Sequence, residues 1–161
     1  MVFGVSPTRD AVVIAHTTGS GETFAIKSIR SIRFLARSGQ NLAELRRHLL
    51  AIFNRGKSRH STIALFGSSS GRFKSSVEAI KAETIIELTA AESGVPVVRV
   101  TAASLKKVLG CATGEKWQAC AGERFNRTGS HKDWSRGAAG AAAAALKVAG
   151  DRSSAVGRVH N

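Results

Sequence analysis

Short apolar runs and longer stretches with helical spacing divide the chain into predicted strands and helices. The first run, Val2–Arg9, is apolar up to Val5 and reaches a polar turn through Ser6 and Pro7. Such a run is typical of a strand buried on both faces, and Pro7 ends the strand because proline has no amide hydrogen to donate. We expect this segment to be the central strand of a sheet, with Ser6 at its tip.

Four further segments have the composition of strands. Gly19 and Gly21 predict a turn between the second and third strands. The apolar positions change phase between Ile26 and Ile29, which predicts a bulge in the third strand. The polar positions of that strand, among them Arg30, are basic, and they fit either a solvated face or one turned toward nucleic acid. The four segments are Ala11–Ala15, Phe24–Leu35, Ser61–Phe66 and Val95–Val100.

Apolar residues three and four positions apart predict helices in five segments. Asn41 with Glu44 gives the first helix a capping box, Thr101 caps the third and Asp133 caps the fifth. The expected helices are Asn41–Phe53, Ser75–Ser93, Ala102–Leu109, Gly114–Phe125 and Asp133–Ala145. In the second of these helices, the stripe expected to face the core is Val77, Ile80, Thr84, Leu88 and Ala91.

From Gly137 onward the last predicted helix consists of alanine and glycine, including Gly140. Glycine lowers helix propensity, so these residues favour a helix that lies unusually close to a sheet or to another backbone. After Gly150 the chain is polar and basic. We therefore expect one domain over residues 1–150 and a disordered basic tail over residues 151–161.

The charge of the chain indicates a polyanionic partner. Among 161 residues, 24 are Lys or Arg and 11 are Asp or Glu, which gives a net charge of +13. This excess favours nucleic acid first and an anionic membrane surface second, although a basic protein whose charge is incidental remains an alternative. No apolar stretch reaches the ~18–20 residues of a membrane span, and no secretion signal is visible. The cytoplasm is the simplest location.

Metal-ligating and redox motifs are not apparent. Cys111 and Cys120 match no zinc or redox spacing, so we expect buried or idle thiols in a reducing compartment. The histidines are isolated. Glu83 and Glu87 lie one helical turn apart and could share a divalent cation, but without a third ligand a solvated face is the better interpretation.

One loop and one aromatic residue could contact nucleic acid. The loop Gly67–Arg72, followed by Lys74, offers amides, hydroxyls and charge to a phosphate, but it lacks the Gly-Lys-Ser/Thr ending of a P-loop and fits a plain connection equally well. Trp117 fits either the core or a platform on which a base stacks.

The order of these elements resembles the RNase H-like fold, and several motifs are similar to RuvC-type Holliday-junction resolvases. The opening Gly4–Pro7 resembles the family's "GIDP", and the alanine-rich helix resembles its "DALAIA" ending. The segments Gly94–Pro96, Leu105–Gly110 and Gly114–Gln118 resemble further motifs of the family. The chain is also similar to an uncharacterised bacterial branch of this superfamily, in which the acidic motifs look altered too. The resemblance implies an α/β fold with a five-stranded mixed sheet flanked by helices.

The resemblance also implies four catalytic carboxylates, and most are replaced here. The first aspartate falls on Ser6, and the glutamate at the end of the fourth strand falls on Phe66 or Gly67. When Asp133 is aligned with one of the final pair, Arg136 stands at the other. Hydrolysis with two metal ions needs several carboxylates to hold cations ~4 Å apart, so one surviving aspartate does not suffice.

These departures favour a catalytically degenerate member of the group, a pseudo-nuclease that binds nucleic acid, DNA rather than RNA, without metal or other cofactor. Arginines in place of acids would let the cleft hold phosphate directly by charge-assisted hydrogen bonds. The candidate contacts are Arg9, Arg72, Lys74, Lys106, Lys107, Lys116 and Arg136.

Two alternatives remain open. One is an active Mg²⁺- or Mn²⁺-dependent endonuclease or resolvase that recruits acids from Asp10, Glu83, Glu87 and Asp133. The other is a protein-interaction scaffold, which could pair with itself as a homodimer.

Overall fold

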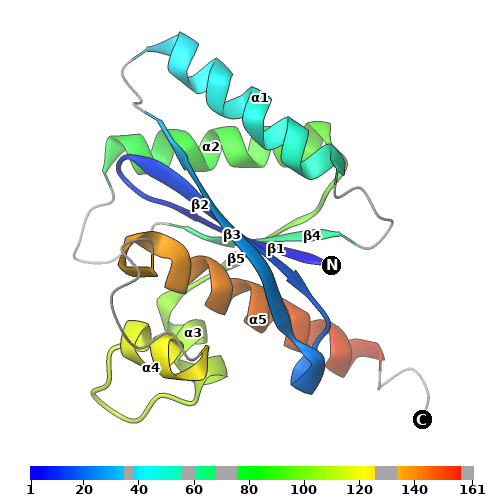
Figure 1. Ribbon diagram of the computed structural model, residues 1–161, viewed down its shortest axis with the longest axis vertical. Helices are drawn as coiled ribbons and strands as arrows, with labels where there is room; N and C mark the ends of the chain where they lie inside the picture. The colour runs from blue at the N-terminus through cyan, green and yellow to red at the C-terminus, as the bar shows by residue number, and fades with distance from the viewer. Residues whose placement is uncertain (35–37, 56–60, 68–75, 126–133, 157–161) are drawn as a thin grey trace.

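The structure is a computed structural model that describes residues 1–34, 38–55, 61–67, 76–125 and 134–156, without the side chains of 135, 136 and 153–156. A single mixed sheet separates two groups of helices, with α1 and α2 on one face and α5, α3 and α4 on the other (Figure 1). None of the described helices is both long and apolar enough to cross a membrane.

The sheet has five strands in the order β3-β2-β1-β4-β5, which confirms β1 as the central strand. The β1 strand pairs antiparallel with β2 and parallel with β4. The predicted bulge lies in β3, because His16 pairs with Ser28 whereas Thr17 pairs with Ile26, leaving Lys27 as the additional residue. The strands are β1 Val2–Pro7, β2 Ala11–Thr18, β3 Ala25–Arg33, β4 Thr62–Phe66 and β5 Val97–Val100.

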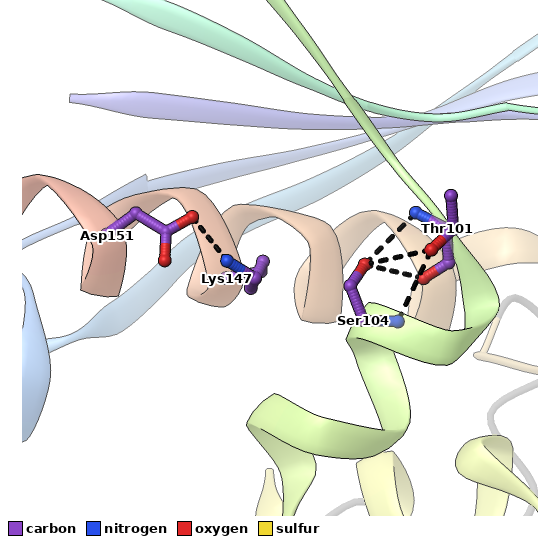
Figure 2. Close-up of polar contacts among 4 residues, drawn as sticks. All are labelled: Thr101, Ser104, Lys147 and Asp151. Carbon is purple, nitrogen blue, oxygen red and sulfur yellow. Dashed lines mark hydrogen bonds and ion pairs between the residues drawn. The ribbon is translucent and has the colours of Figure 1, made fainter.

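The helices follow the predicted order with shifted ends. They are α1 Gly39–Arg55, α2 Val77–Glu92, α3 Ala102–Leu109, α4 Trp117–Arg124 and α5 Ala139–Val156, with a 3₁₀ turn at Gly21–Thr23 and a π-helical turn at Trp134–Ala138. Thr101 caps α3 as predicted: Ser104 donates its amide to Oγ1 of Thr101, at 3.3 Å, and Thr101 donates its own amide to Oγ of Ser104, at 3.1 Å (Figure 2).

Two predicted helix starts are wrong. Asn41 does not cap α1, which begins at Gly39; instead Asn41 donates its amide to Oγ of Ser38, at 3.3 Å. Helix α4 begins at Trp117 rather than Gly114, because Gly114 has a φ of 89°, outside the helical region.

The predicted buried stripe of α2 is also wrong. Val77, Ile80 and Leu88 are 63%, 50% and 48% exposed, whereas the small residues Ala82 and Ala90 are fully buried against the sheet side. Both stripes have helical spacing, so the period does not distinguish them. The packing of α2 distinguishes the two stripes, because alanine at Ala82 and Ala90 lets α2 lie close to its neighbours.

Helix α5 lies unusually close to the sheet, as its composition predicts. A Cβ on Gly4 of β1 would lie 1.7 Å from the carbonyl oxygen of Ala141, so only glycine fits there. The helix also continues to Val156, and the ion pair between Lys147 and Asp151 spans the predicted boundary (Figure 2). The expectation of a disordered tail is therefore wrong for residues 151–156, while residues 157–161 lie outside the described part.

The prediction of idle thiols is wrong as well. Cys111 and Cys120 form a disulfide between the turn after α3 and helix α4, with their Cα atoms 5.8 Å apart. The physical reason is the turn at Gly110, whose φ of 68° ends α3 in the left-handed conformation and returns the chain toward α4. The spacing of the two cysteines along the sequence contains no sign of this turn.

Candidate nucleic-acid interface

The tip of β1 is covered by the start of α5. Ser6 is 4% exposed and lies on the α5 face of the sheet. A Cβ on Gly137 or on Gly140 would lie 3.3 Å from the Ser6 hydroxyl oxygen. The helix backbone thus occupies the space next to Ser6, which leaves little room for a larger side chain there.

Phe66 fills the neighbouring position at the end of β4. A Cβ on Gly140 would lie only 2.6 Å from Cδ1 of Phe66, so the ring rests against the backbone of α5. The Phe66 ring also meets Trp117 of α4 edge to face, with centroids 5.0 Å apart. Trp117 is therefore part of the packing around Phe66. Ser6, Phe66 and Gly140 together form what we call the strand-tip cluster.

The acidic residues of α2 lie on the other face of the sheet. Phe66 points toward α5, so a Cβ on Gly67 would point the opposite way, and it would lie 3.1 Å from the Glu83 carboxylate. Glu83 is buried. Arg99 of β5 forms an ion pair with Glu83, with 3.2 Å between Nη1 and Oε2, and another with Glu87, with 2.7 Å between Nη2 and Oε1. The solvated face expected for this pair is wrong for Glu83, because Arg99 compensates its charge.

This arrangement does not resemble a metal site. Within the described residues, no group of three or more His, Cys, Asp or Glu side chains could hold a metal ion. The backbone of Arg136 belongs to the π-helical turn before α5. Asp133, Arg72 and Lys74 lie outside the described residues.

The remaining basic candidates form two groups. Arg9 is exposed in the β1–β2 turn, at the same end of the sheet as Ser6, and Lys116 is exposed directly before Trp117, which contacts Phe66. Lys106 and Lys107 are exposed in the last turn of α3. Arg9 is thus close in the chain to Ser6, and it also lies near enough to Glu78 of α2 to influence that carboxyl. Lys116 is next to Trp117 in the chain, and Lys106 and Lys107 lie on α3, whose residues Leu105 and Leu109 belong to the same apolar cluster as Phe66 and Trp117.

A second basic surface includes the basic positions of β3, for which the sequence left open a solvated face or one turned toward nucleic acid. A groove of about 720 Å³ runs between α1 and β3, lined by Arg30 and Arg33 from the strand and Arg55 from the helix. The sequence shows arginines in both segments, but nothing in their spacing indicates that β3 and α1 face each other.

Solved structures identify the fold. No protein-family model matches the chain, and no curated protein matches its sequence significantly. The structure of T. thermophilus RuvC in complex with Holliday junction substrate matches with a TM-score of 0.70, covering 91% of this chain and 90% of that chain at 15% identity. The chain has the RuvC fold. A second Thermus thermophilus RuvC structure matches with a TM-score of 0.68 at 16% identity, covering 91% of each chain. The predicted RNase H-like, RuvC-like architecture is therefore confirmed.

Proposed function

We propose that this protein binds nucleic acid, DNA in preference to RNA, and does not cleave it with metal ions. The observation that carries this proposal is the strand-tip cluster. The resemblance to RuvC-type resolvases puts carboxylates at Ser6 and at Phe66 or Gly67, where the chain has a buried hydroxyl and an aromatic ring packed on helix backbone. The Phe66 ring has no oxygen atom with which to bind a metal cation. The carboxylate ligands that hydrolysis with two metal ions requires are therefore missing at these positions.

The charge of the chain supports nucleic acid as the partner. With a net charge of +13, the protein attracts polyanions, and Arg9 and Lys116 are exposed cations close in the chain to Ser6 and Trp117. The RuvC structure of similar fold was determined with a Holliday junction substrate, which favours DNA over RNA. Binding of this kind requires no cofactor.

The test is fluorescence anisotropy with a labelled four-way junction, duplex DNA, and single-stranded DNA and RNA at several salt concentrations. We expect log K to fall linearly with log salt, with a slope of about −0.9 for each phosphate contacted in a duplex. Arg9→Gln and Lys116→Gln should each reduce the slope by about 1. Absence of binding, or binding that salt does not change, would refute the proposal.

The control for this experiment is Arg47→Gln, which removes an exposed cation on α1, across the sheet from the strand-tip cluster. It should leave the affinity for DNA within about twofold, because a distant exposed charge is screened by salt. An equal loss in the control and in the two test variants would show that net charge, not this interface, governs binding.

The nuclease alternative is tested on the same labelled junction with Mg²⁺ or Mn²⁺. We expect no cleavage. Cleavage that EDTA abolishes would show that the protein is a metal-dependent nuclease and would refute this part of the proposal. The recruited acids would then be identified with the variants Asp10→Asn, Glu83→Gln, Glu87→Gln and Asp133→Asn.

One observation favours self-association as a second candidate property. Val77, Ile80 and Leu88 form an exposed apolar stripe along α2, and large apolar side chains grouped on a surface are typical of interfaces. We expect sedimentation velocity to show a dimer that Ile80→Glu and Leu88→Glu weaken. The control, Gln118→Glu, adds the same charge on α4 and should leave the dimer intact; a wild-type monomer throughout would refute self-association.

A further inference from the structure

The groove between α1 and β3 combines an apolar floor with a basic rim. Its floor is formed by Phe3 of β1 and Ile14 of β2, both 3% exposed. Its volume of about 720 Å³ lies within the ~300–1,000 Å³ range of small-molecule sites. The size and the apolar floor indicate an organic ligand rather than a lone ion.

An aromatic stack forms one side of the groove. The rings of Phe3 and His16 lie 5.4 Å apart and nearly parallel, with an interplanar angle of 21°. Burial, and then the charges of Arg30, the chain's amino terminus and Lys27, lower the pKa of His16, which keeps the ring neutral near neutral pH. A neutral ring stacked on another ring favours a flat ligand that continues the stack.

The rim carries arginines that form no ion pair within the described residues. Arg30, Arg33 and Arg55 are exposed, and in the described part of the chain none of them forms an ion pair with an acidic side chain. A guanidinium binds a phosphate through two parallel hydrogen bonds, which a lysine cannot do. Arginines that line one groove from a strand and from a helix therefore suit a phosphate bound in that groove.

We propose that this groove binds a phosphorylated compound with a flat ring, the chemical class of a mononucleotide. The ring lies over the His16–Phe3 stack, and Arg30 and Arg55 hold the phosphate, with the hydroxyls of Ser28 and Ser31 available for the sugar. The groove is on the α1 face of the sheet, whereas the strand-tip cluster is on the α5 face. This site is therefore separate from the proposed nucleic-acid interface and does not depend on it.

The binding test is a titration of the full chain, followed by amide NMR spectra, with AMP, GMP, CMP and UMP, with the four corresponding nucleosides and with ribose 5-phosphate. At least one mononucleotide should shift the amides of His16, Ser28, Arg30 and Ala51. Its nucleoside and the sugar phosphate should each bind at least about tenfold more weakly, because each lacks one of the two contacts. If none of the four mononucleotides shifts these amides at millimolar concentration, the proposal is wrong.

Variants test the role of the rim. Arg30→Gln and Arg55→Gln should each weaken nucleotide binding about tenfold, the loss expected for one charge-assisted contact. Arg30→Lys keeps the charge but loses the paired hydrogen bonds, so its loss should be intermediate. The matched control is Arg124→Gln on α4, across the sheet. Unchanged affinity in the Arg30→Gln/Arg55→Gln double variant would overturn the proposal.

The nucleotide could be free or part of a strand, and a short single-stranded oligonucleotide with a 5′ phosphate distinguishes these sources. If the oligonucleotide shifts the groove amides and the double variant abolishes this shift, the groove accepts a nucleotide unit of a strand. If only mononucleotides shift them, the ligand is a small molecule. Junction binding through the strand-tip interface should be unchanged in the double variant, so failure of one proposal leaves the other measurable.

Discussion

The two faces of the sheet are packed in opposite ways. On the α5 face, Gly4 and the alanines of the helix bring backbone against backbone, and the contact at Ala141 leaves no space for a Cβ. On the α1 face, large side chains such as Phe53 and Leu49 fill the core near the centre, and an open groove remains beside β3. Small side chains produce a close contact without a cavity, whereas large ones hold the helix away from the sheet.

This difference separates the chemistry of the two faces. The α5 face contains the position where the resemblance puts a catalytic site, and close packing has filled it with the Phe66 ring. The α1 face has no counterpart in the family motifs, yet it has a groove lined by arginines that form no ion pair within the described residues. A resemblance to a family therefore indicates where a site would lie, and the packing decides whether there is space for a ligand.

The largest expected effect is a loss of stability when a side chain is inserted into the close contact between β1 and α5. Gly4→Val would place side-chain atoms on the Ala141 carbonyl oxygen, and α5 would have to move as a unit because the clash is with backbone. We expect a loss of about 4 kcal/mol or more in the free energy of unfolding, measured with urea.

The control for this variant is Gly39→Ala at the start of α1, where a Cβ would meet no atom within 4 Å. It should change stability by less than about 0.5 kcal/mol. A stable Gly4→Val protein would show that α5 does not lie against β1.

The next effect concerns the ring that fills the strand tip. Phe66→Ala removes the contacts with Trp117 and with the backbone at Gly140, and we expect a loss of about 3 kcal/mol together with a change in tryptophan fluorescence. Val98→Ala on edge strand β5, 42% exposed, is the control and should cost less than about 1 kcal/mol. Equal losses in both variants would contradict the packing described here.

A smaller effect is expected from the ion pair on the α2 side. Arg99→Gln removes the cation that compensates the buried Glu83 carboxylate, and we expect a loss of about 1–2 kcal/mol, limited because Arg99 is 55% exposed. Adding Glu83→Gln should restore part of this stability. The control is Arg46→Gln, which breaks the exposed ion pair with Glu92 and should not measurably change the free energy of unfolding. A larger loss of stability in Arg46→Gln than in Arg99→Gln would contradict this interpretation.

The smallest effect is a pH dependence from His16. Its pKa is lowered in the folded protein, so below the ordinary value of 6.5 the unfolded chain binds more protons and stability falls as the pH falls. His16→Gln should reduce the loss of stability between about pH 7 and pH 5, measured by urea unfolding at each pH. An unchanged pH dependence would show that the groove does not desolvate His16.

Much of the fold could be predicted because local signals agreed with it. The apolar run up to Pro7 predicts the central strand, and the phase change between Ile26 and Ile29 predicts the bulge. The α2 stripe could not be predicted, since Val77 and Ala82 both belong to stripes with helical spacing and only tertiary packing decides which stripe is buried.

The candidate site was predictable in part. The resemblance led directly to Ser6 and Phe66, but not to the contact between Phe66 and Gly140, because the two residues lie on elements far apart in the chain. Glu83 was expected on a solvated face, since nothing local to α2 indicates that Arg99 of β5 would bind it. The basic positions of β3 left a face toward nucleic acid open, but nothing in the sequence indicated the groove beside β3, because it exists only between two elements.

The sequence by itself determined the strands, the helices, their order and the small residues that bring α5 close, since these follow from local periodicity, turn residues and side-chain size. Tertiary structure alone decided what stands at the tip of β1, which stripe of α2 is buried, how Cys111 meets Cys120 and where a groove stays open. The physical reason is that contacts and cavities depend on distances between elements, and those distances are set by the packing of all side chains together.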